Sequence, residues 1–230
     1  MDLYYGKADD DGKIVLVDDE FRHLKVVRTN VGDQLSVTDG EGNLFTASIT
    51  EIGKHDCKLA VLNKEQFEKQ LPLLHLAIAP TKNIDRIEWL VEKCVEAGVD
   101  RISFLKCRHS ERKEIKTERL NRIAISAMKQ SKKKFLPVIS EITDFNLFVQ
   151  SATENQKLIC EMNAPIDHHI KNILKREDAL ILIGPEGDFS PEEIEYAGKN
   201  GFLSVNLGPE RLRTETAALS ACVYFNFFKH

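Results

Sequence analysis

The stretch ILIGPEGDFSPEEIE, residues 181–195, passes from a run of apolar side chains through a glycine-proline turn into a charged segment. Gly184 and Gly187 allow a tight path and a close approach of the backbone to a ligand, while Pro185 stiffens the turn and Glu186 stands at its tip. In open α/β sheets, ligands bind beyond the carboxyl ends of the strands. The stretch therefore predicts a strand that delivers a binding loop.

A second loop of the same kind follows in LGPERLRTETAALSA, residues 207–221, where a glycine turn leads through charged residues into a helix of small side chains. Neither loop has the spacing of a Walker phosphate loop or of the G-x-G-x-x-G dinucleotide motif, which disfavours ATPase and dinucleotide-binding functions. Each loop alone is compatible with a purely structural turn. Together they predict a pocket made largely of main chain, which suits a cofactor already activated for group transfer.

Around these loops, residues 71–230 alternate between apolar runs and amphipathic segments, which predicts an α/β domain with a mostly parallel sheet. Asn83 and Ser190 are the expected N-caps of two of the helices, and Gly98 is an expected helix stop. The expected strands are 73–79, 101–107, 157–162, 179–184 and 202–207, and the expected helices are 83–98, 117–133, 191–200 and one from about Thr214.

Residues 1–70 follow a different pattern, with short strands separated by Asp-Gly, Gly-Asp and Glu-Gly-Asn turns. The expected strands are 13–17, 33–39, 43–52 and 57–62, with a helix at 21–28. Short strands at close spacing with one inserted helix predict a small β-barrel. We therefore expect a barrel domain at 1–70 and an α/β domain at 71–230.

Composition is that of an ordinary globular protein, with 42% hydrophobic and 30% charged residues and a formal net charge of −4. RNA contacts therefore require local basic clusters. The five cysteines are dispersed, without a CxxC pair, which favours reduced thiols in a cytoplasmic protein over disulfides or a metal site. No apolar run reaches membrane-spanning length and no signal-peptide pattern is seen, so we expect no membrane partner.

The two C-terminal motifs, IGPEGDFSPEEIEYA and LGPERLRTETAALSA, resemble the signature of the ribosomal RNA small subunit methyltransferase E family, in the SPOUT class of knotted methyltransferases. The segments TKNIDRIEWLVEKCVEAGV and AMKQSKKKFLP match further family motifs, and residues 22–42 resemble its N-terminal PUA-like barrel. The resemblance implies a trefoil-knotted, mostly parallel sheet with helices on both faces after the PUA-like barrel. It also implies a homodimer.

The same resemblance implies S-adenosylmethionine-dependent methylation of N3 of a uridine in 16S rRNA of the small ribosomal subunit, without a metal. Arg213 and Glu186 are the catalytic candidates: Arg213 would stabilise charge on the uracil ring, and Glu186 would orient the cofactor or act as a base. An ion pair of Arg213 with Glu215 or Glu186 is the structural alternative. The expected cofactor-binding residues are Leu182, Gly184, Pro185, Glu186, Gly187, Leu207, Gly208, Leu212, Thr214, Thr216 and Ala217.

RNA contacts are expected from two basic clusters, one on the barrel helix and one at 129–134, because phosphate binding requires Lys and Arg. The expected RNA-binding residues are Arg22, His23, Arg28, Lys82 and Lys133. Six positions depart from the family pattern: Asp188 replaces a glycine, Ala97 a leucine, Lys129 a glutamate, Lys133 an arginine, and Glu210-Arg211 an arginine followed by an aliphatic residue. The opposite charge changes at 129 and 210 suggest compensation across a dimer interface.

Two other functions fit the same sequence. One is a non-catalytic RNA-binding or ribosome-assembly module on a knotted scaffold, which would bind no S-adenosylmethionine. The other is a nucleotide hydrolase with Glu186 as its acid or base, which the missing phosphate loop and metal carboxylates disfavour.

Overall fold

The computed structural model describes residues 2–229 and divides into two compact units. The first unit contains the residues up to 69 together with 125–136, and the second contains 70–124 and the residues from 137 onward. The segment 125–136, which the sequence-based division assigns to 71–230, thus groups with the first unit. Each unit has its own hydrophobic core.

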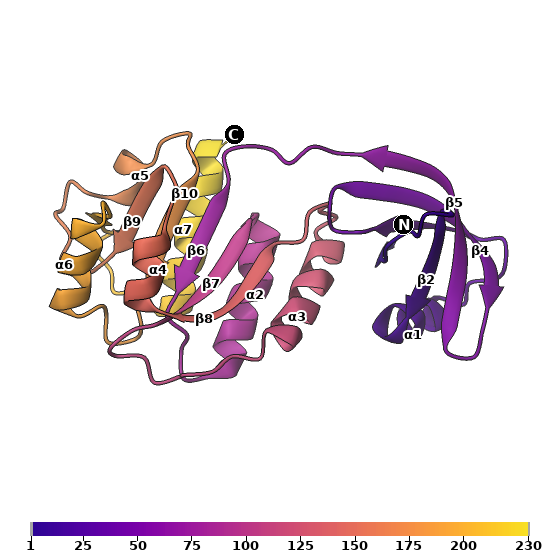
Figure 1. The fold of residues 1–230 in the computed structure, drawn as a ribbon, viewed down its shortest axis with the longest axis horizontal. Coiled ribbons are helices and arrows are strands. Elements are labelled where there is room, and N and C mark those ends of the chain that lie inside the picture. The colour runs from indigo at the N-terminus through magenta and orange to yellow at the C-terminus, as the bar shows by residue number, and fades with distance from the viewer. Residues whose placement is uncertain (1, 230) are drawn as a thin grey trace. The chain divides into compact units, whose positions relative to one another are not determined.

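The first unit contains the helix α1 and a five-stranded mixed sheet in the order β1-β3-β4-β5-β2. Figure 1 labels α1, β2, β4 and β5 of this unit. The β1 strand pairs with β3 in parallel and the other ladders are antiparallel, while an isolated bridge between Ala8 and Ile14 joins the segment after β1 to β2. The β1 strand and its parallel pairing were not predicted. The elements are β1 (Leu3–Tyr5), β2 (Lys13–Val17), α1 (Asp18–Val27), β3 (Gln34–Thr38), β4 (Asn43–Ile52) and β5 (Asp56–Gln66).

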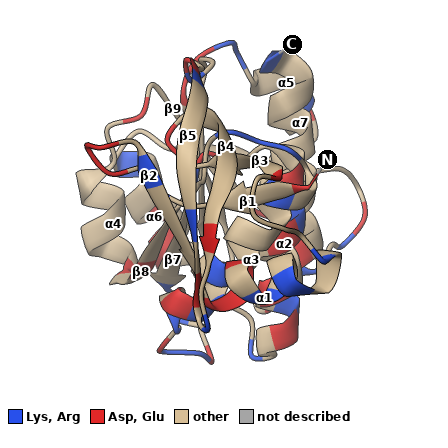
Figure 2. Cartoon of the chain, turned by 90° about the vertical axis from the view of Figure 1, so that its right-hand side faces the viewer, with Lys and Arg blue, Asp and Glu red and all other residues tan. Residues whose placement is uncertain are grey.

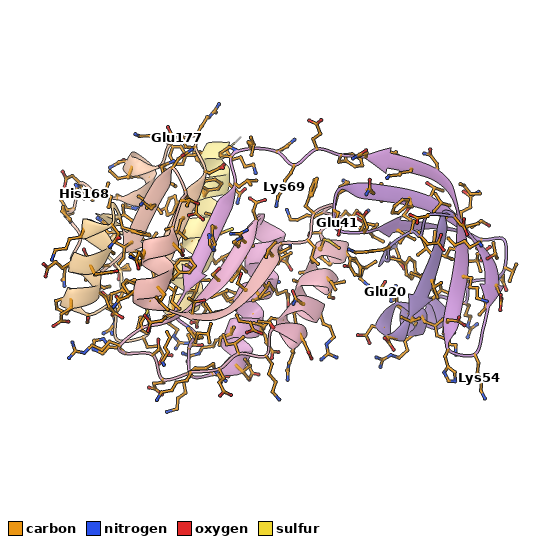
Figure 3. All side chains as sticks on the ribbon, in the orientation of Figure 1. Glu20, Glu41, Lys54, Lys69, His168 and Glu177 are labelled. Carbon is orange, nitrogen blue, oxygen red and sulfur yellow. The ribbon has the colours of Figure 1, made fainter. Side chains whose placement is uncertain are left out.

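The segment 125–136 is held to this sheet by backbone and charge contacts. Gly42 N–H donates to the Lys134 carbonyl at 3.0 Å, and Leu136 N–H donates to the Gly40 carbonyl at 2.8 Å. The carboxylate of Glu20 on α1, which is labelled in Figure 3, lies 2.5 Å from the Lys129 ammonium, and its other oxygen accepts from Tyr5 N–H at 3.0 Å. Lys129 therefore has a partner inside its own unit.

The second unit is an α/β layer structure around a six-stranded sheet, β11-β9-β10-β6-β7-β8, in which every ladder is parallel. The α4 and α6 helices pack on one face, and α2 and α7 pack together on the other (Figure 1). The elements are β6 (Leu74–Ile78), α2 (Ile84–Ala97), β7 (Arg101–Lys106), α3 (Thr117–Gln130), β8 (Val138–Asp144), α4 (Phe145–Ser151), β9 (Gln156–Cys160), α5 (Ile170–Ile173), β10 (Ala179–Ile183), α6 (Pro191–Lys199), β11 (Leu203–Val205) and α7 (Thr214–Lys229). Of α3, only the residues up to 124 belong to this unit, and those from 125 onward belong to the first.

The predicted caps are confirmed at three helix ends. The Asn83 side chain accepts from Asp85 N–H, Gly98 ends α2 with a φ of 101°, and Ser190 and Glu193 form a reciprocal capping box at α6. The β8 strand and the α4 and α5 helices were not predicted. Because the strands run in the same direction, the loops after β9, β10 and β11 all leave the sheet at the carboxyl ends of the strands. The candidate site lies at this end of the sheet.

Candidate active site

A cavity of about 580 Å³ lies where the loops that follow β9, β10 and β11 meet, within the second unit. Its wall combines the segment 160–162, the segment 183–188 and the segment 206–214, with Arg86 of α2 and Ala217 of α7. The predicted residues that line it are Gly184, Pro185, Glu186, Gly187, Leu207, Gly208, Leu212, Arg213, Thr214 and Ala217.

The two glycine loops are joined directly. The Thr214 hydroxyl donates to the Gly184 carbonyl at 3.1 Å, and the Arg211 guanidinium donates to the Glu186 carbonyl at 3.3 Å. Because these bonds connect positions about thirty residues apart in sequence, the loop after β11 is docked on the loop after β10. The cavity wall is thus a single, hydrogen-bonded structure.

Two glycines of these loops are required for different reasons. Gly208 has a φ of 123°, a conformation that residues with a Cβ rarely adopt. Gly184 has ordinary dihedrals, but a Cβ there would lie 3.1 Å from the Phe189 ring and 3.2 Å from an Asp188 oxygen, closer than nearly all Cβ contacts. Larger residues at either position would therefore deform the cavity wall.

Asp188, which replaces a family glycine, adopts a φ of 63° that glycine takes without strain. Its side chain compensates by accepting two backbone N–H groups, from Phe189 at 2.8 Å and from Met162 at 3.2 Å. Aspartate is among the residues that tolerate this left-handed conformation because its short polar side chain bonds locally. Asp188 thereby connects the loop after β10 to the loop after β9.

Arg86, which was not predicted from the sequence, pairs with two carboxylates, Glu186 on the cavity wall and the buried Glu215. Its guanidinium lies 2.9 Å from the Glu186 carboxylate and 3.7 Å from the carboxylate of Glu215. Glu215 is buried, and its second oxygen has no hydrogen-bond partner among residues 2–229. The only sequence signal for Arg86 is its place in the family-like segment 81–99, on the polar side of α2.

Arg213 lies on the cavity wall with its side chain exposed and, within the described chain, without an ion-pair partner. The ion pair with Glu215 or Glu186 that the sequence left open as a structural alternative is formed by Arg86 instead. A guanidinium free of carboxylates keeps its five donors available for a ligand. Among the described residues Arg211 also lacks an ion-pair partner, but it donates to the Glu186 carbonyl, whereas no side-chain hydrogen bond is seen for Arg213.

Two predicted cofactor contacts do not line the cavity. Leu182 is fully buried in the core beneath α4 and α6, because successive side chains of a strand point to opposite faces, and its neighbour Ile183 lines the cavity instead. Thr216 is also absent from the wall, since Ala217 lies one turn after Arg213 on the cavity side of α7.

The loop after β9 contributes three lining residues that were not predicted, Cys160, Glu161 and Met162. Burial, followed by the charge of Asp188, raises the pKa of the Cys160 thiol, so it stays protonated and is a poor nucleophile. All five cysteines are buried and free. Among residues 2–229 there is no cluster of His, Cys, Asp and Glu that could hold a metal ion.

The predicted RNA-binding residues of α1 are exposed but mostly paired. Arg22 forms an ion pair with Asp19 in the preceding turn, and His23 lies 3.4 Å from the carboxylate of Asp2. Arg28 ends the helix and is exposed. The acidic residues of this helix occupy its first turn and the basic residues follow, and both charges are seen on it in Figure 2.

The remaining basic candidates fall in different units. Lys133 belongs to the first unit and has no ion-pair partner in the described part of the chain, whereas Lys82 of the second unit pairs with Glu111 at 2.9 Å. Glu210 lies on the cavity wall without an ion-pair partner, again among the described residues. Since Lys129 is bonded to Glu20, its charge is already compensated without Glu210.

A family model described as an RNA methyltransferase domain matches residues 68–226, and one described as an RNA methyltransferase PUA domain matches residues 16–62. The fold and site are thus those of an RNA methyltransferase with an N-terminal PUA-like domain. The chain is 32% identical over 224 residues to ribosomal RNA small subunit methyltransferase E of Rickettsia conorii, covering 92% of this chain and 88% of the relative. The chain therefore belongs to the ribosomal RNA small subunit methyltransferase E family.

Two solved structures are similar over nearly the whole chain. A "probable rRNA-methyltransferase" from Porphyromonas gingivalis superposes with a TM-score of 0.90 at 39% identity, covering 100% of this chain and 98% of that one. Ribosomal RNA small subunit methyltransferase E from Neisseria gonorrhoeae, bound to S-adenosylmethionine, superposes with a TM-score of 0.82 at 27% identity, covering 96% and 95%. No helix in the described residues has the length and apolarity needed to span a membrane.

Proposed function

We propose that this protein transfers the methyl group of S-adenosylmethionine to N3 of a uridine in the 16S rRNA of the small ribosomal subunit. The observation that carries the proposal is the cavity at the carboxyl ends of β9, β10 and β11, whose two glycine loops are bonded to each other. The family membership and the S-adenosylmethionine bound to the Neisseria gonorrhoeae relative support it.

The residues present fit S-adenosylmethionine. A volume of about 580 Å³ falls in the range of small-molecule pockets, which hold drug-sized ligands. The wall offers apolar side chains for the adenine ring, such as Ile183, Leu207 and Leu212, and main chain from both glycine loops for polar contacts. The carboxylate of Glu161 supplies negative charge near a ligand that carries an ammonium and a sulfonium group.

When bound, S-adenosylmethionine supplies an electrophilic methyl group on a sulfonium, which leaves as a neutral thioether and needs neither metal nor acid. The protein then has two tasks: to align N3 with the methyl group, and to stabilise the negative charge that the uracil ring gains as N3 loses its proton. Arg213 is the proposed donor to that charge, because it lies on the cavity wall with no ion-pair partner among residues 2–229.

Glu186 is proposed to orient the cofactor. Its carboxylate already accepts from Arg86 at 2.9 Å, which fixes the position of the side chain on the cavity wall. Arg86 is in this scheme a positioning residue, because it fixes Glu186 and neutralises the buried Glu215. The remaining cofactor contacts are proposed for Gly184, Pro185, Gly187, Leu207, Gly208, Thr214 and Ala217, all of which line the cavity.

We further propose that the C-terminal segment is threaded into a trefoil knot and that the protein acts as a cytoplasmic homodimer. The docking of the loop after β11 onto the loop after β10 supports the first proposal. Exposed apolar side chains on α7, Val223 at 53% and Phe227 at 79%, support the second, because a second copy would remove them from water. The reduced cysteines support the location.

The proposal is tested by incubating the protein with small subunits from cells that lack this methylation and with isotopically labelled S-adenosylmethionine. The 16S rRNA is then digested and its nucleosides are separated by mass spectrometry. We expect label in 3-methyluridine at one position. Binding of RNA without binding of S-adenosylmethionine would instead identify a non-catalytic assembly module, and label in another nucleoside would refute the N3 assignment.

A further inference from the structure

The loop 184–187 separates the cofactor cavity from a second cavity on its other side. This second cavity has a volume of about 350 Å³ and is lined by residues from 80–82, 109–111 and 185–187, all of the second unit. Pro185, Glu186 and Gly187 line both cavities. A ligand in the second cavity is therefore one loop away from the cofactor.

The second cavity continues past Lys82 and Glu111 into a hollow of about 430 Å³ that is lined by Lys82 and residues 111–114. We call the two together the outer cleft, defined by residues 80–82, 109–114 and 185–187. Because the two hollows share Lys82 and Glu111, they offer adjoining positions for successive groups of a chain-like ligand.

The floor of the outer cleft is fixed by hydrogen bonds. The Arg112 guanidinium donates to the Thr81 carbonyl at 3.1 Å and to the Lys82 carbonyl at 2.5 Å, which joins the segments before α2 and after β7. The His109 Nδ1 lies 3.1 Å from the Asp188 carbonyl and donates to it, since a carbonyl only accepts. Both bonds position the cleft against the loop 184–187.

Cations of the cleft are available to an anionic ligand. The Lys113 ammonium is exposed and has no ion-pair partner within residues 2–229. Lys82 pairs with Glu111, but both side chains are exposed, and surface ion pairs of this kind are weak enough to exchange for a phosphate. Arg112 is held in place by its two carbonyls and keeps further N–H donors.

We propose that the outer cleft binds the RNA strand beside the target base, with its phosphodiester groups against Lys82, Arg112 and Lys113, so that the base crosses Gly187 to reach the cofactor cavity. The proposal rests on the proposed function. N3 of uridine is on the Watson–Crick edge and is hidden in a duplex, so the base has to be unpaired and its strand held. Phosphate contacts fix the register of a strand without reading its sequence.

Gly187 suits this crossing because it presents no side chain. A Cβ built there would lie 3.5 Å from the His109 Cβ, in ordinary contact, and Gly187 has no positive φ. A larger residue at 187 is therefore compatible with the fold but would fill the path between the outer cleft and the cofactor cavity.

The first test measures the affinity of the full chain for a fluorescently labelled single-stranded oligouridylate at several salt concentrations. Lys113→Glu is compared with Lys175→Glu, which reverses the charge of another exposed lysine. Lys175 precedes the amino end of β10, whereas the loop 184–187 follows its carboxyl end. We expect Lys113→Glu to weaken RNA binding several-fold and to lower the salt slope by about 0.7 for each phosphate that the variant no longer binds. Equal effects of the two variants would overturn the proposal.

The second test uses Gly187→Val, with S-adenosylmethionine affinity measured by calorimetry beside methylation of small subunits. We expect methylation at saturating S-adenosylmethionine to fall at least tenfold, so that the loss exceeds whatever change the substitution makes in cofactor affinity. Normal methylation by Gly187→Val would overturn the crossing path. If the wild type itself neither binds S-adenosylmethionine nor methylates, the proposed function fails, whereas wild-type activity with an unaffected Lys113→Glu removes the outer cleft alone.

Discussion

The basic residues of α1 and the arginines of the cofactor cavity differ in how their charges are used. On α1, Arg22 is paired with Asp19 and Lys129 neutralises Glu20. At the cavity, Arg86 pairs with Glu186 and Glu215, whereas Arg211 and Arg213 have no ion-pair partner among residues 2–229. A cluster of basic residues in the sequence therefore does not by itself identify a binding surface, because the neighbouring acidic groups decide which cations remain available to a ligand.

The sequence separation of the partners explains why the ion pair on α1 can be predicted from the sequence and the ion pair at the cavity cannot. Asp19 precedes Arg22 by three residues, so their pairing follows from helix periodicity alone. Arg86 and Glu186 are a hundred residues apart and meet only because β10 lies beside β6 in the sheet. Which cations of the cavity remain unpaired therefore depends on tertiary structure.

The largest effect is expected at Arg213. Arg213→Ala should slow single-turnover methylation by two to three orders of magnitude, about 2–4 kcal/mol, because it removes a donor to charge that develops in the transition state. Arg213→Lys should restore only part of the rate, since it keeps the charge but loses the planar fork. Melting temperature and S-adenosylmethionine affinity should stay near the wild-type values.

If Arg213 has only a structural role, the rate of Arg213→Ala should instead fall in proportion to its stability. A stable Arg213→Ala variant that binds cofactor and turns over normally would remove Arg213 from the chemistry. Arg213 would then resemble the basic residues of α1, which are exposed but take no part in the methyl transfer.

An intermediate effect is expected at Arg86. Arg86→Ala should lower the free energy of unfolding by about 1–3 kcal/mol, because it leaves the buried Glu215 carboxylate without its cation. Adding Glu215→Gln should recover part of that loss, because it removes the unpaired charge. A double-mutant cycle of thermal unfolding measures the coupling, and strictly additive losses would show that the two groups do not interact.

The smallest effect is expected on α1. Arg22→Ala with Arg28→Ala should lower the salt slope of RNA binding by about 0.7 to 0.9 for each phosphate that is no longer neutralised, with unchanged cofactor affinity. Asp19→Ala should act in the opposite direction, because it releases Arg22 from its ion pair. Filter-binding titrations over a salt series measure both variants, and an unchanged slope in the first would remove α1 from the RNA interface.

Much of the fold could be predicted because the signals are local. The Asn83 and Ser190 caps, the Gly98 stop and the alternation of strands with helices all lie within short windows of sequence. The segment 138–151, which forms β8 and α4, follows Pro137 but has no glycine or proline between the strand and the helix to mark where one ends and the other begins. The three-residue β1 is too short to show a period, and its parallel partner β3 is about thirty residues away.

The candidate site was predictable where its residues follow a motif and not where they converge from distant elements. The glycine loops lie on the cavity wall as a pair, while Leu182 and Thr216, which belong to the same motifs, point elsewhere because side chains alternate along a strand and rotate around a helix. Arg86 and Glu161 reach the wall from α2 and from the end of β9. No motif in the sequence joins these two residues to the glycine loops.

The most direct test of the cofactor site is a calorimetric titration of S-adenosylmethionine into the wild type, Ala217→Leu and Thr216→Leu. Ala217 lines the cavity and Thr216, one residue before it on α7, does not. We predict that Ala217→Leu loses measurable binding because its side chain fills the cavity, while Thr216→Leu binds as the wild type does. Equal binding by folded Ala217→Leu and the wild type would contradict the assignment of this cavity to the cofactor.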